Sequence, residues 1–324
     1  MSASLPTLHF LTGSDAYTDY RPAIGPSGDV VIFERTPAGG GLTVLYKIAD
    51  LTVPNPVPFR SGTPLPPSQT RPDFCWKTGS VAFNGAETNR SAVRVWQIGA
   101  DGANPQPIPN TQRSAYPTWS LDGTFLVTEN AGAAAAPRPC NTVFAAGGTV
   151  PPPYPNIDGT DQAGVPLFGG MPTVGPKDLP QIAFAGQPAL VGWGGATSPE
   201  PAYNQDKNYI FLNAATNGVF TSAPMESAAS VTTYDPRHQG RAPAWSPDGR
   251  TIAFESNRSG NGYAIYLCDL PTGAIVRVTH PSLGGQHAKF FPTGTRLILC
   301  IRHPGGSPVT MGIAWVDISA LLKS

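Results

Sequence analysis

The residues of this chain that are best suited to chemistry are arginines and histidines placed beside short apolar runs. Arg71 and Arg241 each stand a few residues before an aromatic side chain and a glycine-containing turn. A guanidinium group can hold a carboxylate or a phosphate through two parallel hydrogen bonds, so converging arginines favour an anion. Gln286 and His287, by contrast, offer an amide oxygen and an imidazole, which are ligands for manganese or zinc. The sequence therefore raises two hypotheses, anion binding and metal chemistry.

The motifs of the common enzyme classes do not occur in the sequence. It contains no Gly-x-Ser-x-Gly elbow, no His-Glu-x-x-His, no Gly-x-x-x-x-Gly-Lys and no dinucleotide fingerprint. The formal net charge is zero, with 21 Lys and Arg in 324 residues, so we expect no nucleic-acid partner. No run of about 18 apolar residues is present, so we expect no membrane insertion.

The elements that position the arginines and histidines belong to an internal repeat. Its clearest copy, Arg241 to Ser256, reads RAPAWSPDGRTIAFES. This order predicts a strand, a tight turn in which glycine supplies a positive φ, and a second strand. Five weaker copies align with it without gaps, and the six anchor glycines are Gly28, Gly79, Gly123, Gly186, Gly249 and Gly294. Their spacing fits one four-stranded propeller blade plus loops of variable length.

This repeat resembles that of the TolB-type (WD40-like) propellers, whose hallmark is Pro-x-Trp-Ser-Pro-Asp-Gly followed by Ile-Ala-Phe-x-Ser. Pro243 to Ser256 matches the hallmark closely, Pro117 to Thr128 matches it in part, and the other four copies match it weakly. The resemblance implies an all-β fold, a six-bladed β-propeller of four-stranded antiparallel blades, as a single domain over residues 1–324. We expect the propeller without the N-terminal domain of TolB.

The two ends of the sequence predict how the ring closes. The sixth copy has a third strand at Gly312 to Asp317 and then ends within a few residues. Thr7 to Thr12 is an apolar run at the right distance before Gly28 to serve as the missing fourth strand. An N-terminal strand in the last blade would remove an exposed sheet edge, so we expect a closed ring.

Strand direction predicts where ligands bind. Strands alternate in an antiparallel blade, so the short glycine turns lie on one face and the long loops on the other, which we call the loop-decorated face. The gap-free alignment places two residues of each innermost strand at the channel mouth on that face. These are Tyr20, Arg71, Ala115, Asp178, Arg241 and Gln286 at one position, and Arg21, Pro72, Tyr116, Leu179, Ala242 and His287 at the next.

Blades two and five are opposite in a ring of six, so we expect Arg71 and Arg241 to face each other and to converge on a small anion. In the alternative, Arg241 pairs with Asp178 of the adjacent blade and only ties the ring together. The expected function is a non-catalytic binding module that recognises a protein partner or a small anionic or saccharide ligand and needs no cofactor. The predicted ligand-binding residues are Tyr20, Arg21, Arg71, Tyr116, Asp178, Arg241, Gln286 and His287.

A second resemblance supplies an alternative function. Oligogalacturonate lyases look like TolB-type propellers and hold a divalent metal over the channel with several histidines and a glutamine. The resemblance implies a site for Mn, Zn or Ca at His238, His287 and His303, in a metal-dependent lyase or hydrolase acting on an acidic saccharide. That family has seven blades, which is a departure from this sequence. Asn156 to Asp161 is also rich in oxygen ligands, but it lacks the EF-hand spacing, and we favour an Asx-type turn there.

The segment 131–176 is a long insertion rich in Pro, Gly and Ala. We expect it to include outer strands of the third blade near Asn141 to Ala146 and Val165 to Phe168. The four cysteines lack metal-ligand spacing, so we expect reduced, structural thiols. Met1 leads directly into the first strand without the apolar core of a signal peptide. We therefore expect a cytoplasmic protein, or a periplasmic or secreted one if a leader has been removed.

Overall fold

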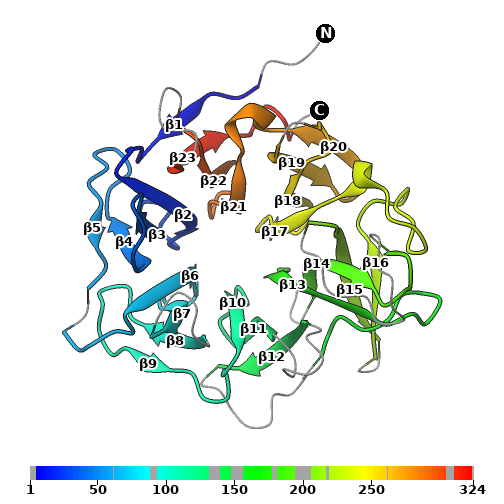
Figure 1. Ribbon diagram of the computed structural model, residues 1–324, viewed down its shortest axis with the longest axis horizontal. Helices are drawn as coiled ribbons and strands as arrows, with labels where there is room; N and C mark the ends of the chain where they lie inside the picture. Colours follow the sequence, from blue (N-terminus) through cyan, green and yellow to red (C-terminus); the bar gives the residue numbers. More distant parts are fainter. Residues whose placement is uncertain are drawn as a thin grey trace.

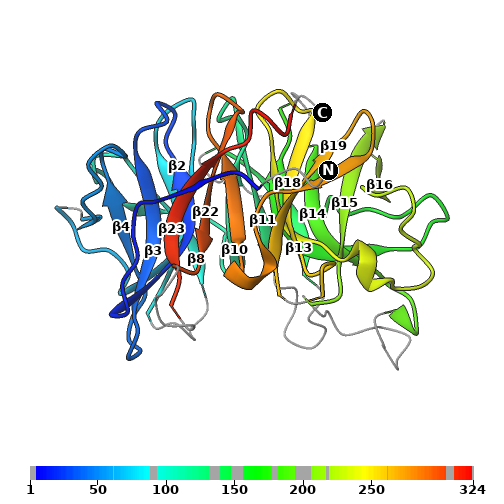
Figure 2. The same ribbon diagram turned by 90° about the horizontal axis from the view of Figure 1, so that it is seen from above.

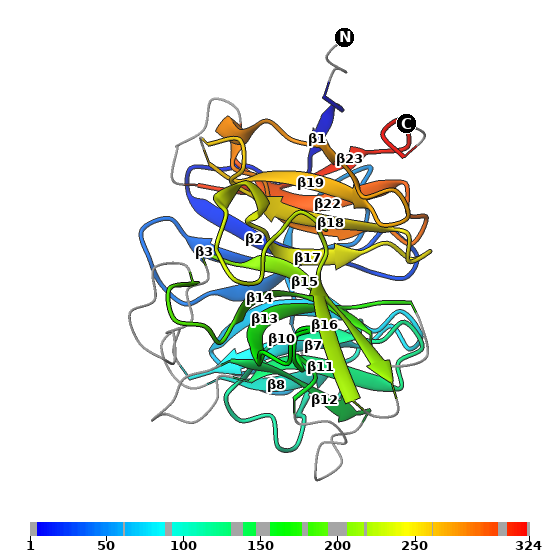
Figure 3. The ribbon, with the colours of Figure 1, turned by 90° about the vertical axis from the view of Figure 1, so that its right-hand side faces the viewer.

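A computed structural model describes residues 5–60, 62–87, 93–130, 139–146, 156–176, 181–193, 206–216, 219–260, 262–303 and 310–322. In these residues, six antiparallel sheets are arranged as blades around a central axis (Figure 1). Seen from the side, the strands run between the two faces of the ring (Figure 2, Figure 3). The all-β, six-bladed propeller predicted from the repeat is confirmed.

Blades one to five each use successive strands of the chain, counted from the channel outward, and blade six combines the last three strands with the first. Blade one contains β2 (Tyr17–Ile24), β3 (Val31–Pro37), β4 (Val44–Ile48) and β5 (Val57–Pro58), and blade two contains β6 (Ser68–Phe74), β7 (Val81–Ala86), β8 (Arg94–Ile98) and β9 (Gln106–Pro107). Blade three contains β10 (Ser114–Trp119), β11 (Phe125–Asn130) and β12 (Cys140–Ala145), and blade four contains β13 (Leu167–Val174), β14 (Ile182–Pro188), β15 (Tyr209–Thr216) and β16 (Val219–Pro224). Blade five contains β17 (Arg241–Trp245), β18 (Thr251–Ser256), β19 (Ala264–Asp269) and β20 (Ala274–Arg277), and blade six contains β21 (Gln286–Phe290), β22 (Arg296–Ile301), β23 (Gly312–Asp317) and β1 (Leu8–Phe10).

The N-terminal strand closes the ring as predicted. β1 pairs with β23, with Leu8 opposite Val316 and Phe10 opposite Ala314. Thr12 extends the contact, because its Oγ1 accepts the Ile313 N–H at 2.9 Å. The first strand of the chain is thus the outermost strand of the last blade (Figure 1).

The core lies between neighbouring blades. Because both faces of a blade pack against other blades, its inner strands do not alternate between apolar and polar residues. All six residues of β18 are buried, and so are all eight of β13. The second strands therefore carry the continuous apolar runs that mark the repeat in the sequence.

The same backbone hydrogen bond marks the position of the fourth strand in all six blades, including blade three. In each blade one outer residue donates its N–H to a carbonyl of the third strand at 2.8–3.0 Å: Leu11 to Ile313, Phe59 to Leu45, Ile108 to Val95, Ile157 to Asn141, Met225 to Ile210 and Val278 to Ile265. Ile157 therefore stands where the fourth strand of blade three is expected, although the sheet has three strands among the residues that the structure describes.

Two sequence-based assignments near the insertion need correction. The expected strand at Asn141 to Ala146 exists as β12, but Val165 to Phe168 is not an outer strand of blade three. Leu167 begins β13, the innermost strand of blade four. The insertion 131–176 thus contains strands of two blades, because the innermost strand of blade four carries no Trp-Ser-Pro-Asp-Gly sequence by which it could be recognised.

Gly186 is not the turn glycine of the fourth blade. It lies inside β14, opposite Gly169 of β13 and Tyr209 of β15. The turn between the first two strands comes earlier, and Gly175 N–H bonds the Gln181 carbonyl across it. A Cβ on Gly186 would lie 2.6 Å from the Phe184 ring, so this glycine serves ring packing. The other five anchors do have a left-handed φ of 71–80°, as the turn requires.

The oxygen-rich segment Asn156 to Asp161 forms turns and packs against blade three. Asp158 N–H bonds the Asn156 side chain, and Asp161 Oδ1 accepts the N–H groups of Ala163 and Val165. These are the Asx-type turns that the sequence favoured. Asp158 itself is fully buried and accepts hydrogen bonds from Asn141 N–H, Asn141 Nδ2 and Gly169 N–H.

The four cysteines form no disulfide in the structure. Cys75, Cys268 and Cys300 are buried, Cys140 is partly buried, and all four are free thiols. Among the described residues, no helix is long and apolar enough to cross a membrane.

We expect removal of residues 1–12 to destabilise the whole ring. The truncation takes away β1 and Leu11, which is 7% exposed and packs in the core between blades six and one. The loss should be at least the roughly 2–5 kcal/mol typical of a buried leucine cut to alanine. Thermal melts of the truncated protein, Leu11→Ala and the exposed-site control Leu42→Ala give the measurement. A truncated protein that melts cooperatively at the wild-type temperature would refute closure by this strand.

Asp158→Asn should remove a pH-dependent loss of stability. Burial raises the pKa of the Asp158 carboxyl well above its ordinary value, although its hydrogen bonds lower it. The native state therefore holds the proton more tightly than the unfolded chain does, and stability falls as pH rises through the native pKa. Asparagine removes this loss, which is about 1.4 kcal/mol for each unit of pKa shift.

The comparison for this experiment is Asp122→Asn, measured by denaturant unfolding from pH 4 to 8. The pKa of Asp122 is lowered by the hydrogen bond from Ser120, so the native state favours its ionised form. The contribution of Asp122 is present above the unfolded pKa and is lost as pH falls, so Asp122→Asn should cost stability at neutral pH. Parallel pH profiles for Asp158→Asn and wild type would contradict the role assigned to Asp158.

Candidate functional site

Each innermost strand is interrupted once by a β-bulge, at the same place in all six blades. The strand register skips between Tyr20 and Ala23 in blade one and between Arg241 and Ala244 in blade five, and the other four blades repeat the break. One residue of each bulge is left-handed, with φ between 43° and 53°; we call these the bulge residues, Arg21, Arg71, Tyr116, Met171, Ala242 and His287. Side chains other than glycine seldom adopt this φ, so the conformation must be held from outside.

A side chain of the preceding blade accepts a hydrogen bond from four of the six bulge residues. Glu34 of β3 accepts the Arg71 N–H at 2.6 Å, and Glu255 of β18 accepts the His287 N–H at 2.7 Å. Asn84 accepts the Tyr116 N–H and Glu129 accepts the Met171 N–H, each at 3.1 Å. We call these four acceptors the belt. The belt ties each of these blades to the next and fixes the direction of these four bulge residues.

Ala185 interrupts the belt between blades four and five. It pairs with Gly170 in the register in which Glu255 pairs with Arg241, but its methyl group accepts no hydrogen bond. Met171, Ala185 and Ala242 form a small buried apolar cluster instead, and Tyr116 packs against it.

The bulge residues line a chamber of the channel on the loop-decorated face. Its wall also contains Lys289 and the residues that follow the bulge residues, Pro22, Pro72, Pro117, Pro172, Pro243 and Ala288. About 50 Å³ is open to the centres of water-sized molecules, which is room for only a few small groups. Lys289 Nζ lies 3.1 Å from Asp73 Oδ1, and both residues also line a second hollow at the turn face of the channel.

Two arginines of the chamber differ in how they are paired. Arg21 Nη1 lies 3.0 Å from Glu34 Oε2, and Arg21 Nη2 lies 3.5 Å from the Tyr116 hydroxyl. Arg71 rests on the Tyr116 ring, 4.4 Å from its centroid, with Nη1 3.5 Å from Thr70 Oγ1. Arg71 makes no ion pair with any described residue, and its buried Nε has no hydrogen-bond partner there. Arg71 is therefore a cation in the chamber whose bonding capacity is largely unused.

Two titratable groups near Arg71 have shifted pKa values. Burial raises the pKa of the Glu129 carboxyl, while the hydrogen bond from Met171 N–H and the charges of Arg71 and Arg21 lower it, and the net direction is upward. Burial also lowers the pKa of His287 well below its ordinary value, with Arg21, Arg241 and Arg71 acting in the same direction. His287 therefore presents a neutral imidazole to the chamber.

The gap-free sequence alignment placed Arg71 and Arg241 at equivalent positions. In the structure their positions differ by one residue. The turn of blade two is one residue longer, since Gly79 N–H bonds Cys75 whereas Gly249 N–H bonds Ser246. Arg71 is consequently a bulge residue, and Arg241 stands one residue before the bulge residue of blade five.

Arg241 binds carboxylates other than the one expected. Its Nε lies 2.7 Å from Glu255 Oε2 and its Nη1 lies 3.3 Å from Asp206 Oδ1, while its guanidinium stacks 3.7 Å from the Tyr263 ring centroid. Asp178 falls outside the described residues. Its placement at the channel mouth had rested on Gly186 as a turn glycine, which the structure contradicts.

Four of the eight predicted ligand-binding residues line the chamber: Arg21, Arg71, Tyr116 and His287. Tyr20 and Gln286 lie behind His287, where the Tyr20 hydroxyl donates to Gln286 Oε1 and the Tyr20 ring meets His287 edge-on. Gln286 Oε1 also accepts Arg241 Nη2 at 3.3 Å.

The belt and the apolar side of the chamber were not predicted from the sequence. Glu34, Glu129 and Glu255 each follow the apolar run of a second strand, and this shared offset was a readable signal. Met171 carried no comparable signal. The gap-free alignment had taken β14 as the innermost strand of blade four, whereas Met171 lies on β13, the strand before it.

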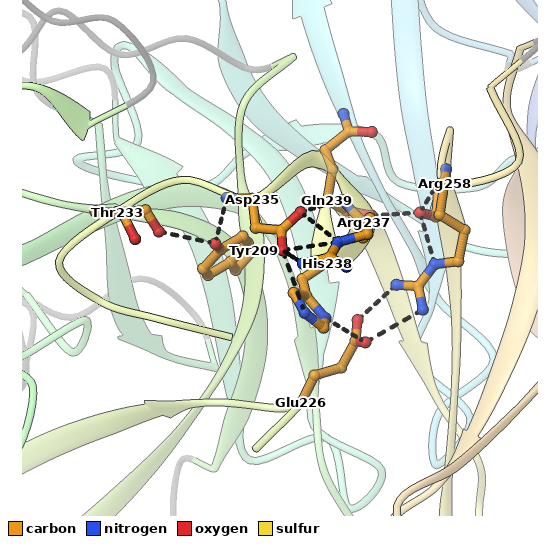
Figure 4. A network of polar contacts seen from close by, with 9 residues as sticks. Tyr209, Glu226, Thr233, Asp235, Arg237, His238, Gln239 and Arg258 are labelled. Carbon is orange, nitrogen blue, oxygen red and sulfur yellow. Dashed lines mark hydrogen bonds and ion pairs between the residues drawn. The ribbon is translucent and has the colours of Figure 1, made fainter. Parts of the chain in front are cut away.

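The histidines expected to bind metal lie at three separate places. His238, on the short helix η2 (Pro236–His238), contacts Glu226 at 3.0 Å, and Glu226 in turn holds Arg258 (Figure 4). His287 lies in the chamber, and His303 packs against Phe10, with ring centroids 4.6 Å apart. In the described part of the chain, no three His, Cys, Asp or Glu side chains gather into a metal-binding group.

No family model matches this chain, and no curated protein matches it. Solved structures do. TolB from Acinetobacter baumannii aligns over 93% of this chain with a TM-score of 0.54 and 15% identity, and this chain spans 63% of that protein. An oligogalacturonate lyase from Vibrio parahaemolyticus aligns over 98% of this chain and 94% of its own, with a TM-score of 0.54 and 11% identity.

A protein of unknown function from Dyadobacter fermentans aligns over 97% of this chain and 99% of its own, with a TM-score of 0.60 and 13% identity. All these identities are low, so the likeness is one of fold. The chain has the fold of the TolB-like β-propellers.

Arg241 and Glu255 should behave as one structural unit. Glu255 is fully buried and also holds the His287 bulge, so Arg241→Ala or Glu255→Ala leaves an unpaired buried group and should cost about 3–5 kcal/mol. The double variant should cost less than the sum of the two. Asp206→Ala is the control, because its carboxylate is 65% exposed and the expected cost is below about 1 kcal/mol. Additive losses in denaturant unfolding would contradict the pairing.

Proposed function

We propose that this chain is a non-catalytic binding module and that its chamber on the loop-decorated face binds a small anionic group. The observation that carries the proposal is Arg71, a guanidinium on the chamber wall without an ion-pair partner among the described residues. A desolvated guanidinium gains strongly from a carboxylate or phosphate, which it can hold through two hydrogen bonds.

The other cations of the region support this assignment by contrast. Arg21 is occupied by Glu34, Arg241 by Glu255, and Lys289 by Asp73. These pairs are structural, because each connects elements of the ring. Arg71 is therefore the residue that we assign to the ligand.

The size of the chamber limits what enters it. A volume of about 50 Å³ accommodates a carboxylate or phosphate with a few further atoms, but not an oligosaccharide or a folded segment of protein. A protein partner or an acidic saccharide would therefore insert a single charged group, with its remaining contacts outside the chamber. The proposal includes no metal, because His238, His287 and His303 lie apart.

Arg71→Gln should weaken anion binding without unfolding the ring. Loss of a charge-assisted hydrogen bond should reduce the binding free energy by about 1.5–3 kcal/mol. The measurement is isothermal titration calorimetry with acetate and inorganic phosphate at constant ionic strength, together with a thermal melt.

Arg60→Gln is the matched control, because it makes the same change of charge at an exposed position. Equal affinities for Arg71→Gln and Arg60→Gln would refute the proposal.

A further inference from the structure

The chamber is chemically divided across the channel axis. Blades one and two contribute the guanidinium groups of Arg21 and Arg71. Blades four and five contribute Met171 and Ala242, followed by Pro172 and Pro243. One side of the wall is therefore cationic and the other is apolar.

The apolar side exists because the belt is interrupted there. At four of the other junctions a polar side chain stands at the position of Ala185 and accepts the next bulge N–H. Met171 is 7% exposed, Ala185 is fully buried and Ala242 is 8% exposed, and the three pack together. No charged residue belongs to this cluster, so this part of the wall favours hydrocarbon over a second charge.

The two sides face each other. Blade two lies across the ring from blade five, as the positions of β6 and β17 show (Figure 1). Arg71 is the bulge residue of blade two and Ala242 that of blade five, and both line the same chamber. A ligand that spans the chamber therefore meets a cation at one end and an apolar surface at the other.

We propose that the chamber selects a short-chain monocarboxylate, with its carboxylate on Arg71 and its hydrocarbon tail on Met171 and Ala242. This inference rests on the proposed function and names the ligand class of the same site. The small open volume limits the tail to a few carbon atoms. A second carboxylate on the tail would be placed against Met171 and Ala242, which offer it no hydrogen-bond donor from their side chains.

The chain-length dependence of binding tests this orientation. We expect the affinity to rise from acetate to propionate to butyrate by up to about fourfold per methylene, which corresponds to about 0.8 kcal/mol for each fully buried group. Succinate, which has the carbon count of butyrate and a second carboxylate, should bind more weakly than butyrate. Isothermal titration calorimetry at constant ionic strength and neutral pH measures all four acids.

Two variants at one position separate the tail contact from the carboxylate contact. Met171→Gln replaces the thioether with an amide of similar length, so it should flatten the rise in affinity from acetate to butyrate. Met171→Leu keeps an apolar side chain and should preserve the rise. Thermal melts show whether each variant is folded, and the wild-type series decides the matter if a variant is not.

A flat series in the wild-type protein, or succinate binding as tightly as butyrate, would overturn the inference. If the series is flat but Arg71→Gln still weakens acetate binding relative to Arg60→Gln, the proposed anion site stands and the ligand class is wrong. If Arg71→Gln and Arg60→Gln bind every acid alike, both proposals fail.

Discussion

The ring depends on one contact between blades, the hydrogen bond from a left-handed residue to a side chain of the preceding blade. Ladder hydrogen bonds act within a blade, and apolar packing between blades sets their separation without fixing their height along the axis. The bond from Arg71 N–H to Glu34, or from His287 N–H to Glu255, adds a directional constraint. It also stabilises a backbone conformation that side chains other than glycine avoid, so the bulge and the blade spacing support each other.

This constraint determines the electrostatics of the channel. Carboxyl groups buried to hold bulges lose hydration, which raises the pKa of Glu129 and Glu255. Arg241 compensates Glu255, and Arg21 compensates Glu34. The candidate site lies where this compensation is incomplete, at Arg71 on one side and at Ala185 on the other. Binding capacity and structural support thus use the same set of positions.

Features that depend on a few neighbouring residues could be predicted from the sequence. The predictions failed where residues had to be aligned between blades across turns and loops of different length. Gly249 and Gly28 could be recognised because a tight turn needs a left-handed residue and glycine supplies it. Gly186 looked the same in sequence but serves ring packing, and one extra residue in the turn before Gly79 displaced Arg71 by one position. The bulge residues could not be predicted, because Arg, Tyr, Met and Ala carry no sign of a positive φ. Their conformation comes from a partner in another blade.

Closure by β1 also sets an order of events during synthesis. The partner of Leu8 is Val316, so β1 cannot pair until β23 has been synthesised. Blades one to five can form from contiguous chain as it emerges, whereas blade six has to join segments separated by nearly the whole sequence. Until then the edge of β1 is unpaired and open to strands of other chains. The final step in forming this ring is therefore also the step at which two nascent copies could exchange their N-terminal strands.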